Sequence, residues 1–138
     1  MPRRFPPDSP LEWLNRARSD LELARSLKPD VYLEDLCFHA QQAAEKAIKA
    51  LLIHYRTPFP YVHDLATLLT LLEQRGVPLP AFIREAERLT RFAVLTRYPS
   101  PAPPIAESEY WEALDVAESV VRWAEEQLTT QEAEYGPG

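Results

Sequence analysis

The sequence predicts an all-α protein: an antiparallel, up-and-down four-helix bundle with an additional short helix. Apolar residues recur at three- and four-residue spacing through most of the 138 residues, and no stretch alternates with a period of two for long enough to form a strand. Fourteen prolines, against three glycines, lie between the periodic segments. Proline breaks a helix but is tolerated in its first turn, so the prolines mark helix ends.

The first helix is expected to begin at Ser9-Pro10-Leu11-Glu12, a capping-box pattern, and to end before Pro29. Asp30 is the expected N-cap of the second helix, which stops at about residue 55 or 56 because Thr57-Pro58 cannot continue it. The inward face of the first helix is predicted to carry Leu14, Ala17, Leu21 and Ala24.

The second helix has two different faces. Small and apolar residues form one of them: Leu36, Ala40, Ala43, Ala44, Ala47, Ala50 and Leu51. The other carries Gln41, Gln42, Glu45 and Lys49, with Phe38 and Leu52 beside them. Polar pairs four residues apart stabilise a solvated helix, whereas a polar line with an apolar flank is a common composition of dimer interfaces. We therefore expect either a solvated face or a surface that meets a second subunit or borders a shared cleft. The second interpretation assigns that role to Phe38, Gln42, Glu45 and Lys49.

The remaining helices follow the same logic. A third, shorter helix is expected after the N-cap Asp64, with leucines at 65, 68, 69 and 72, and Gly76 ends it. A fourth helix is expected from about Pro80 to about Thr96, and the last from about 106 to 128. The predicted inward residues of the fourth are Phe82, Ile83, Ala86, Leu89 and Ala93. Those of the last helix are Tyr110, Leu114, Ala117, Val121, Ala124 and Leu128.

Composition limits the class of protein. The formal net charge of −6 argues against a protein that coats nucleic acid through bulk charge. A single cysteine, Cys37, fits a reducing compartment. No apolar segment is long enough to be the core of a signal peptide or a membrane helix. We expect a cytoplasmic protein with one domain at residues 9–128, a flexible N-terminus at 1–8 and a frayed tail at 129–138.

Charge is distributed unevenly along the last two helices. Arg84, Arg88 and Arg91 share one side of the fourth helix, with Arg97 just beyond, and the last helix is strongly acidic. Two solvated faces that pair with each other explain this pattern. A groove in which arginines face phosphate also explains it, because a guanidinium binds phosphate in a fork.

Other chemistry finds little support. His39, His54 and His63 lack metal-ligand spacing, so structural roles are expected for them, and we expect no metal or cofactor. Cys37 has no triad or redox partner in the sequence and is expected to be a small buried residue.

Several segments in order resemble the HEPN domain family (higher eukaryotes and prokaryotes nucleotide-binding). The resemblance spans about residues 11 to 128. It begins with Trp13-x-x-x-Ala17-x-x-Asp20-Leu21-x-x-Ala24 and is most specific at residues 38–52, Phe-His-Ala-Gln-Gln-Ala-Ala-Glu-Lys-Ala-Ile-Lys-Ala-Leu-Leu. His63-Asp64-Leu65 and Arg97-Tyr98-Pro99 follow. The resemblance implies a helical bundle that forms a homodimer. It also implies a prokaryotic protein that works beside a small nucleotidyltransferase, as in toxin–antitoxin pairs.

Many proteins of this family are metal-independent ribonucleases whose signature is an arginine and a histidine with four to six residues between them. Here the matching region runs from Arg91 to Arg97, with arginine in place of the histidine. Arginine stays protonated and cannot act as a general base, so no catalytic residue is assigned. Arg56 and His63 have the right spacing, but they lie in the loop after the second helix.

We therefore expect a protein that binds nucleotide or RNA phosphate, without ribonuclease activity. The expected phosphate-binding residues are Arg84, Arg88, Arg91, Arg97 and Tyr98. Two alternatives stay open: an interaction module that binds only protein, and a metal-independent ribonuclease that uses His63.

Overall fold

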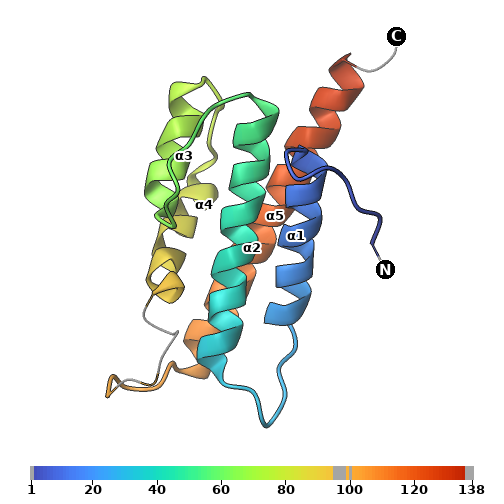
Figure 1. Ribbon diagram of the computed structural model, residues 1–138. Coiled ribbons are helices and arrows are strands. Elements are labelled where there is room, and N and C mark those ends of the chain that lie inside the picture. The colour runs from blue at the N-terminus through green and yellow to red at the C-terminus, as the bar shows by residue number, and fades with distance from the viewer. Residues whose placement is uncertain (1, 95–98, 100, 136–138) are drawn as a thin grey trace.

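The structure, a computed structural model, describes residues 2–94, 99 and 101–135, with side chains as far as residue 129. Within these residues the chain is entirely helical, which confirms the predicted all-α class. The helices are α1 (Pro10–Ala24), α2 (Leu33–His54), α3 (Leu65–Gln74), α4 (Ala81–Arg84), the 3₁₀ helix η1 (Glu85–Ala93) and α5 (Glu107–Tyr135). Along the chain, α1 and the α4–η1 segment run one way while α2 and α5 run the other (Figure 1). The additional short helix is α3, which packs on α2 and η1.

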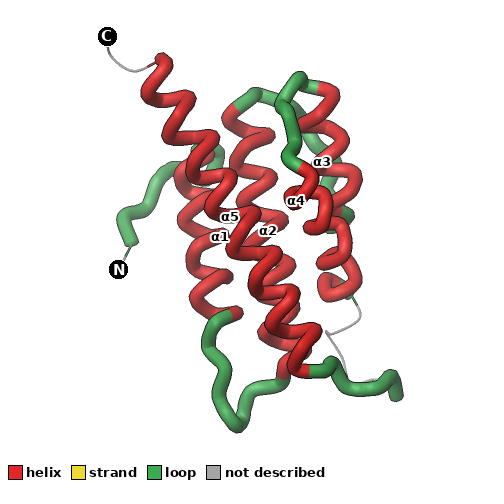
Figure 2. The backbone as a smooth tube through the Cα atoms, turned by 180° about the vertical axis from the view of Figure 1, so that it is seen from behind, coloured by secondary structure: helices red, strands yellow, loops and turns green. Residues whose placement is uncertain are grey.

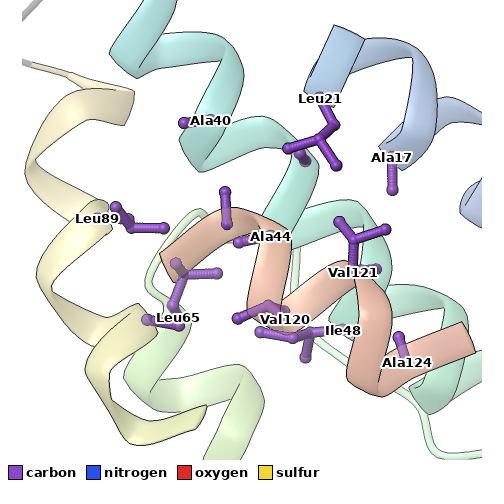
Figure 3. Packing of buried hydrophobic residues seen from close by; sticks show 14 of the residues in the cluster. Ala17, Leu21, Ala40, Ala44, Ile48, Leu65, Leu89, Val120, Val121 and Ala124 are labelled. Atoms are coloured by element: carbon purple, nitrogen blue, oxygen red, sulfur yellow. The ribbon is translucent and has the colours of Figure 1, made fainter. Parts of the chain in front are cut away.

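Helix α2 is the centre of the bundle. It lies between α1 and α5 on one side and α3 and η1 on the other, as both backbone views show (Figures 1 and 2). Its alanines let the neighbouring helices come close, and thirteen of its residues are buried. Figure 3 shows side chains from five elements meeting around it: Ala44 and Ile48 of α2, Ala17 and Leu21 of α1, Leu65 of α3, Leu89 of η1, and Val120 and Val121 of α5. The predicted inward residues of the first, third and last helices are all buried.

Helix ends follow the predicted signals with two differences. Ser9 caps α1 and Asp64 caps α3, as expected. The capping box of α1 is only half formed, because the Glu12 carboxylate accepts the backbone N–H of Phe5 instead of that of Ser9. The N-cap of α2 is Tyr32, without a side-chain hydrogen bond, so the expectation for Asp30 is wrong. The helix begins at Leu33, too far along the chain for Asp30 to cap it.

The C-terminal end of α3 is set by Gly76, which adopts φ +98° directly after the C-cap Arg75. A glycine adopts this left-handed conformation without steric cost, so the prediction for Gly76 is confirmed. The corresponding position after α2 is held by Arg56 at φ 53°, and the backbone N–H of Thr57 then bonds back to Leu52. The chain leaves α2 through this turn and crosses over its polar face.

The largest difference between the predicted and the observed helices concerns the fourth helix. It consists of one α-helical turn followed by nine residues of 3₁₀ helix, which has three residues per turn. Four buried positions are accordingly three apart, at Ile83, Ala86, Leu89 and Phe92, and Ala93 is buried as expected. Phe82, which was expected to point inward, is exposed. Phe92, which was not among the predicted inward residues, is buried.

The last helix continues to Tyr135, beyond the expected end near residue 128. Among the described helices, none combines the length and the apolar character that a membrane crossing requires.

Candidate functional site

The first candidate site is the arginine row, which we define as Arg84, Arg88 and Arg91. Arg84 ends α4, and the other two lie on η1. Residues three apart in a 3₁₀ helix lie one above the other, so Arg88 and Arg91 share one side of the segment. That side faces the acidic helix α5.

Every guanidinium of the arginine row pairs with carboxylates. Arg84 pairs with Glu73 of α3 and, at 2.7 Å, with Glu87. Arg88 bonds Glu85 and Glu112 at 3.0 Å each, and the nearest nitrogen of Arg91 is 2.7 Å from Glu109. The expectation that the basic and acidic faces pair with each other is therefore met by the geometry.

The ion pairs that Arg88 and Arg91 form with α5 border a groove of about 290 Å³ between η1 and α5. Leu89, Phe92, Ala113 and Val116 supply its apolar part. The guanidinium of Arg91 also lies 4.4 Å from the ring centre of Phe92. The hydrogen bond from Arg91 lowers the pKa of Glu109, and the hydrogen bond to Glu85 raises the pKa of Arg88. Both groups are thus firmly charged near neutral pH.

Two predicted site residues lie outside the described part of the chain. Arg97 and Tyr98 follow the last described residue of this segment, Val94. The arginine row leads toward them, and their contribution to the groove stays a prediction.

The second candidate site is the polar seam, which we define as Gln41, Glu45, Lys49 and His63. The Glu45 carboxylate accepts hydrogen bonds from all three other side chains, each at 2.9 Å. Glu45 is 3% exposed and Lys49 is 4% exposed. The α2 residues of the seam are therefore buried and do not form a solvated face of the helix, whereas His63 lies at the exposed edge of the seam.

The loop after α2 buries the seam. It returns over α2 and brings Phe59, Tyr61 and His63 with it, while α1 supplies Trp13. The Lys49 ammonium lies 5.5, 5.6 and 6.0 Å from the ring centres of Phe59, Tyr61 and Trp13. Phe59 and Trp13 are half-buried and cover the lysine, whereas Tyr61 is 94% exposed and lies on the solvent side. Lys49 thus has cation–π partners as well as a carboxylate partner.

Two opposing effects act on the pKa of Glu45 in the seam. Burial is the largest influence on Glu45 and raises its pKa, but the hydrogen bonds from Gln41, Lys49 and His63 outweigh it and lower the pKa overall. The His63 side chain is 44% exposed, so one edge of the imidazole faces Glu45 while part of the ring is open to solvent.

The two other residues of the predicted interface differ in position. Phe38 and Gln42 are half-buried, and the Gln42 amide donates to the side-chain oxygen of Gln41 at 2.7 Å. Leu52, expected beside the polar line, is completely buried. Glu45 and Lys49 make their principal contacts within their own chain, and the role of all four residues in a dimer stays a prediction.

Sequence reasoning missed one further cluster. The Asp20 carboxylate lies 3.1 Å from Nδ1 of His39 and 2.6 Å from the ammonium of Lys46. Its residues come from two helices and from positions nineteen and twenty-six apart, so no local spacing indicated it.

Cys37 is fully buried, as expected, and burial raises the pKa of its thiol to about 12. No group of three or more His, Cys, Asp or Glu side chains among the described residues is placed to hold a metal ion.

Comparison with known proteins finds a matching family model and similar solved structures. A family model described as "HEPN domain" matches residues 11–127. The chain is 36% identical to a crystal structure described as TT1696 from Thermus thermophilus, with a TM-score of 0.74 over 85% of this chain and 96% of that one. It is 31% identical to ST0689, described as an archaeal HEPN homologue, with a TM-score of 0.69 over 86% of this chain and 97% of that one. A search of curated proteins found no match.

Proposed function

The chain belongs to the HEPN domain family, and on that premise we propose that it binds the phosphate groups of a nucleotide or RNA through the arginine row. The observation that carries the proposal is the state of Arg88 and Arg91. Each is held in place by glutamates, and each remains at least half exposed at the border of a groove. A phosphate can therefore reach both guanidinium groups.

The energies of the two kinds of contact favour replacement of the glutamate partners of Arg88 and Arg91 by a phosphate. Exposed ion pairs contribute about 0–1 kcal/mol each, because solvent screens the charges and ordering two long side chains costs entropy. A phosphate that accepts a bidentate fork from a guanidinium forms a stronger, charge-assisted bond. Glu109 and Glu112 thus position the arginines at low cost and give way to a phosphate, which makes binding weak in isolation and sensitive to salt.

Arg97 and Tyr98 extend the row in this proposal. We further propose that the protein acts in the prokaryotic cytoplasm as a homodimer, beside a small nucleotidyltransferase in a toxin–antitoxin-like pair. The likeness to the family supports these assignments. A dimer would place two arginine rows in one assembly and increase the avidity for a phosphodiester chain.

The test is titration of a short fluorescein-labelled RNA with wild type and single-charge variants. Arg88→Gln and Arg91→Gln should weaken binding and reduce the slope of log K against log salt by about 0.7 for each phosphate that the variant no longer neutralises. Glu112→Gln should instead tighten binding, because it removes a competitor for Arg88. Arg18→Gln is the matched control: Arg18 is also half exposed and pairs with a glutamate of α5, but it lies on α1.

Three results would contradict the proposal. Arg88→Gln and Arg91→Gln could behave like Arg18→Gln, Glu112→Gln could leave the affinity unchanged, or the folded wild type could fail to bind. The last result would favour the alternative in which the ligand is only protein. Arg97→Ala tests the extension of the row, since unchanged binding would remove Arg97 from the site.

One observation favours a second candidate, a metal-independent ribonuclease that uses His63. Glu45 holds Nδ1 of the imidazole, and a carboxylate in that position orients a histidine as a general base. RNA cleavage in the presence of a chelator, abolished by His63→Ala, would support this activity. Cleavage that survives His63→Ala would exclude His63 as the base.

A further inference from the structure

The N-terminal segment lies on the side of the bundle away from η1 (Figure 1). It forms one wall of a hollow there. Three hydrogen bonds fasten the segment to α1. The Phe5 N–H donates to Glu12 at 2.9 Å, the Trp13 indole donates to the Pro7 carbonyl at 2.8 Å, and the Asn15 amide donates to the Arg3 carbonyl at 2.6 Å. The segment is therefore held across the first turns of α1 and is part of a formed cavity.

We call this cavity the N-terminal hollow; its volume is about 410 Å³. Its principal lining residues are Arg4, Phe5, Glu12, Trp13, Arg16 and Lys46. Small-molecule sites have volumes of about 300–1,000 Å³, so the hollow has the size of a site for a small ligand.

The charge of the lining is positive, although the chain as a whole carries −6. Three cationic side chains face one carboxylate, that of Glu12, in the lining. Both oxygens of Glu12 are already engaged, one by the Phe5 N–H and the other by Nε of Arg16. Arg4 forms no ion pair with any described residue, and Asp20 behind the lining balances Lys46. Arg4 and the outer nitrogens of Arg16 thus remain to bind an anion.

The same hollow offers aromatic surface. Trp13 is held in one orientation by its bond to Pro7 and by an edge-to-face contact with Phe59, whose ring centre is 6.4 Å away. A ring that is already ordered loses little entropy when a ligand binds to it. Phe5, in the fastened segment, lines the hollow with Trp13.

We propose that the N-terminal hollow binds a mononucleotide: the phosphate contacts Arg4, Arg16 and Lys46, and the base contacts Trp13 and Phe5. Cations beside a fixed aromatic ring are complementary to a ligand that joins an anion to a planar base. The volume of about 410 Å³ is large enough for a single nucleotide. This site shares no residue with the arginine row and does not depend on it.

The test is calorimetric titration of the full chain with three probes: AMP, adenosine and inorganic phosphate. AMP should bind at least about tenfold tighter than either part alone, since it engages both halves of the hollow. Arg16→Gln should weaken AMP about tenfold, the effect of losing one charge-assisted hydrogen bond, and leave adenosine unchanged. Arg4→Gln should act in the same direction, and it breaks no ion pair among the described residues. Trp13→Leu should weaken adenosine and AMP together.

Arg18→Gln is the matched control on α1 and should leave AMP binding unchanged. Because the arginine row is itself a proposed phosphate site, Arg4→Gln and Arg16→Gln are also measured in an Arg91→Gln background, where their effect on AMP should persist. Absence of saturable AMP binding would overturn the proposal, and so would equal affinities for AMP and inorganic phosphate. AMP binding that is lost in Arg91→Gln but kept in Arg4→Gln and Arg16→Gln would assign the ligand to the arginine row instead. Failure of RNA binding at the row, with AMP binding intact, would refute the proposed function and leave this inference standing.

Discussion

Replacing Lys49 with methionine should destabilise the fold strongly, although no bulky core residue is removed. Lys49→Met keeps an unbranched side chain of similar length and removes the charge together with the hydrogen bond that the ammonium donates to Glu45. Glu45 then remains buried with Gln41 and His63 as its donors. The variant isolates the question of what an ion pair inside this bundle contributes.

The magnitude follows from the geometry. At 2.9 Å, two unit charges attract by about 6 kcal/mol at an effective dielectric constant of about 20, and much of this offsets the cost of removing both groups from water. Removing one partner from a buried pair costs about 3–5 kcal/mol, because the other charge is left uncompensated. Since Gln41 and His63 still bond to Glu45, we expect the lower end, about 3 kcal/mol.

Urea denaturation followed by far-ultraviolet circular dichroism measures this loss of unfolding free energy at neutral pH. Arg18→Met provides the control, because its ion pair with Glu125 is exposed and should contribute less than about 1 kcal/mol. The double variant Glu45→Gln with Lys49→Met should be less destabilised than the sum of the two single variants by more than about 1 kcal/mol, which is the coupling of neighbours.

The dependence on pH gives a second measurement. The pKa of Glu45 is lowered below the ordinary value of 4.5, so its contribution is present above 4.5 and is lost as the pH falls through the lower, folded value. Without Lys49, burial should raise this pKa, and the gap between variant and wild type should narrow as the solution is acidified. A loss below about 1 kcal/mol at neutral pH, with strict additivity in the double variant, would refute the reasoning.

Three further outcomes are expected. Tyr110→Phe should cost about 1–2 kcal/mol in unfolding free energy, because the phenol donates to the buried carbonyl of Ala24 at 2.7 Å; an unchanged urea midpoint would contradict this. Asp64→Ala should cost about 1 kcal/mol because α3 loses its N-cap, and Asp64→Ser should restore most of it in the same assay. The Cys37 thiol, whose pKa burial raises to about 12, should react with a thiol reagent at mildly alkaline pH only after denaturation, and fast labelling of the native protein would show that the site opens.

The sequence predicted the bundle well where helical periodicity alone decides burial. The inward residues of α1, α3 and α5 were predicted because a helix with one apolar face leaves a clear period of 3.6 residues. In the segment from α4 to η1 the same signal correctly predicted the burial of Ile83, Ala86, Leu89 and Ala93 but was wrong for Phe82, which is exposed. It also missed Phe92, whose burial follows from the three-residue period of the 3₁₀ helix.

The polar seam shows a different limit. Glu45 and Lys49 have the spacing of a solvated helix face, and nothing local to α2 indicates burial. Their cover comes from Phe59 in the following loop and from Trp13 in α1. The arginine row was predicted from spacing, whereas the N-terminal hollow depends on how residues 3–7 fold back, which composition does not encode.

The 3₁₀ conformation of η1 determines which changes in chain length this segment tolerates. An α-helix keeps its inward face best after a change of about one turn, three or four residues, whereas a 3₁₀ helix keeps it after three. Deleting three residues should keep the buried apolar residues facing the core and the arginine row facing α5. Deleting four should rotate the residues after the deletion by about 120° about the helix axis. The steeper rise of about 2.0 Å per residue, against about 1.5 Å, also stretches nine residues from about 13.5 Å to about 18 Å. A short segment thereby covers a distance for which an α-helix would need about three more residues.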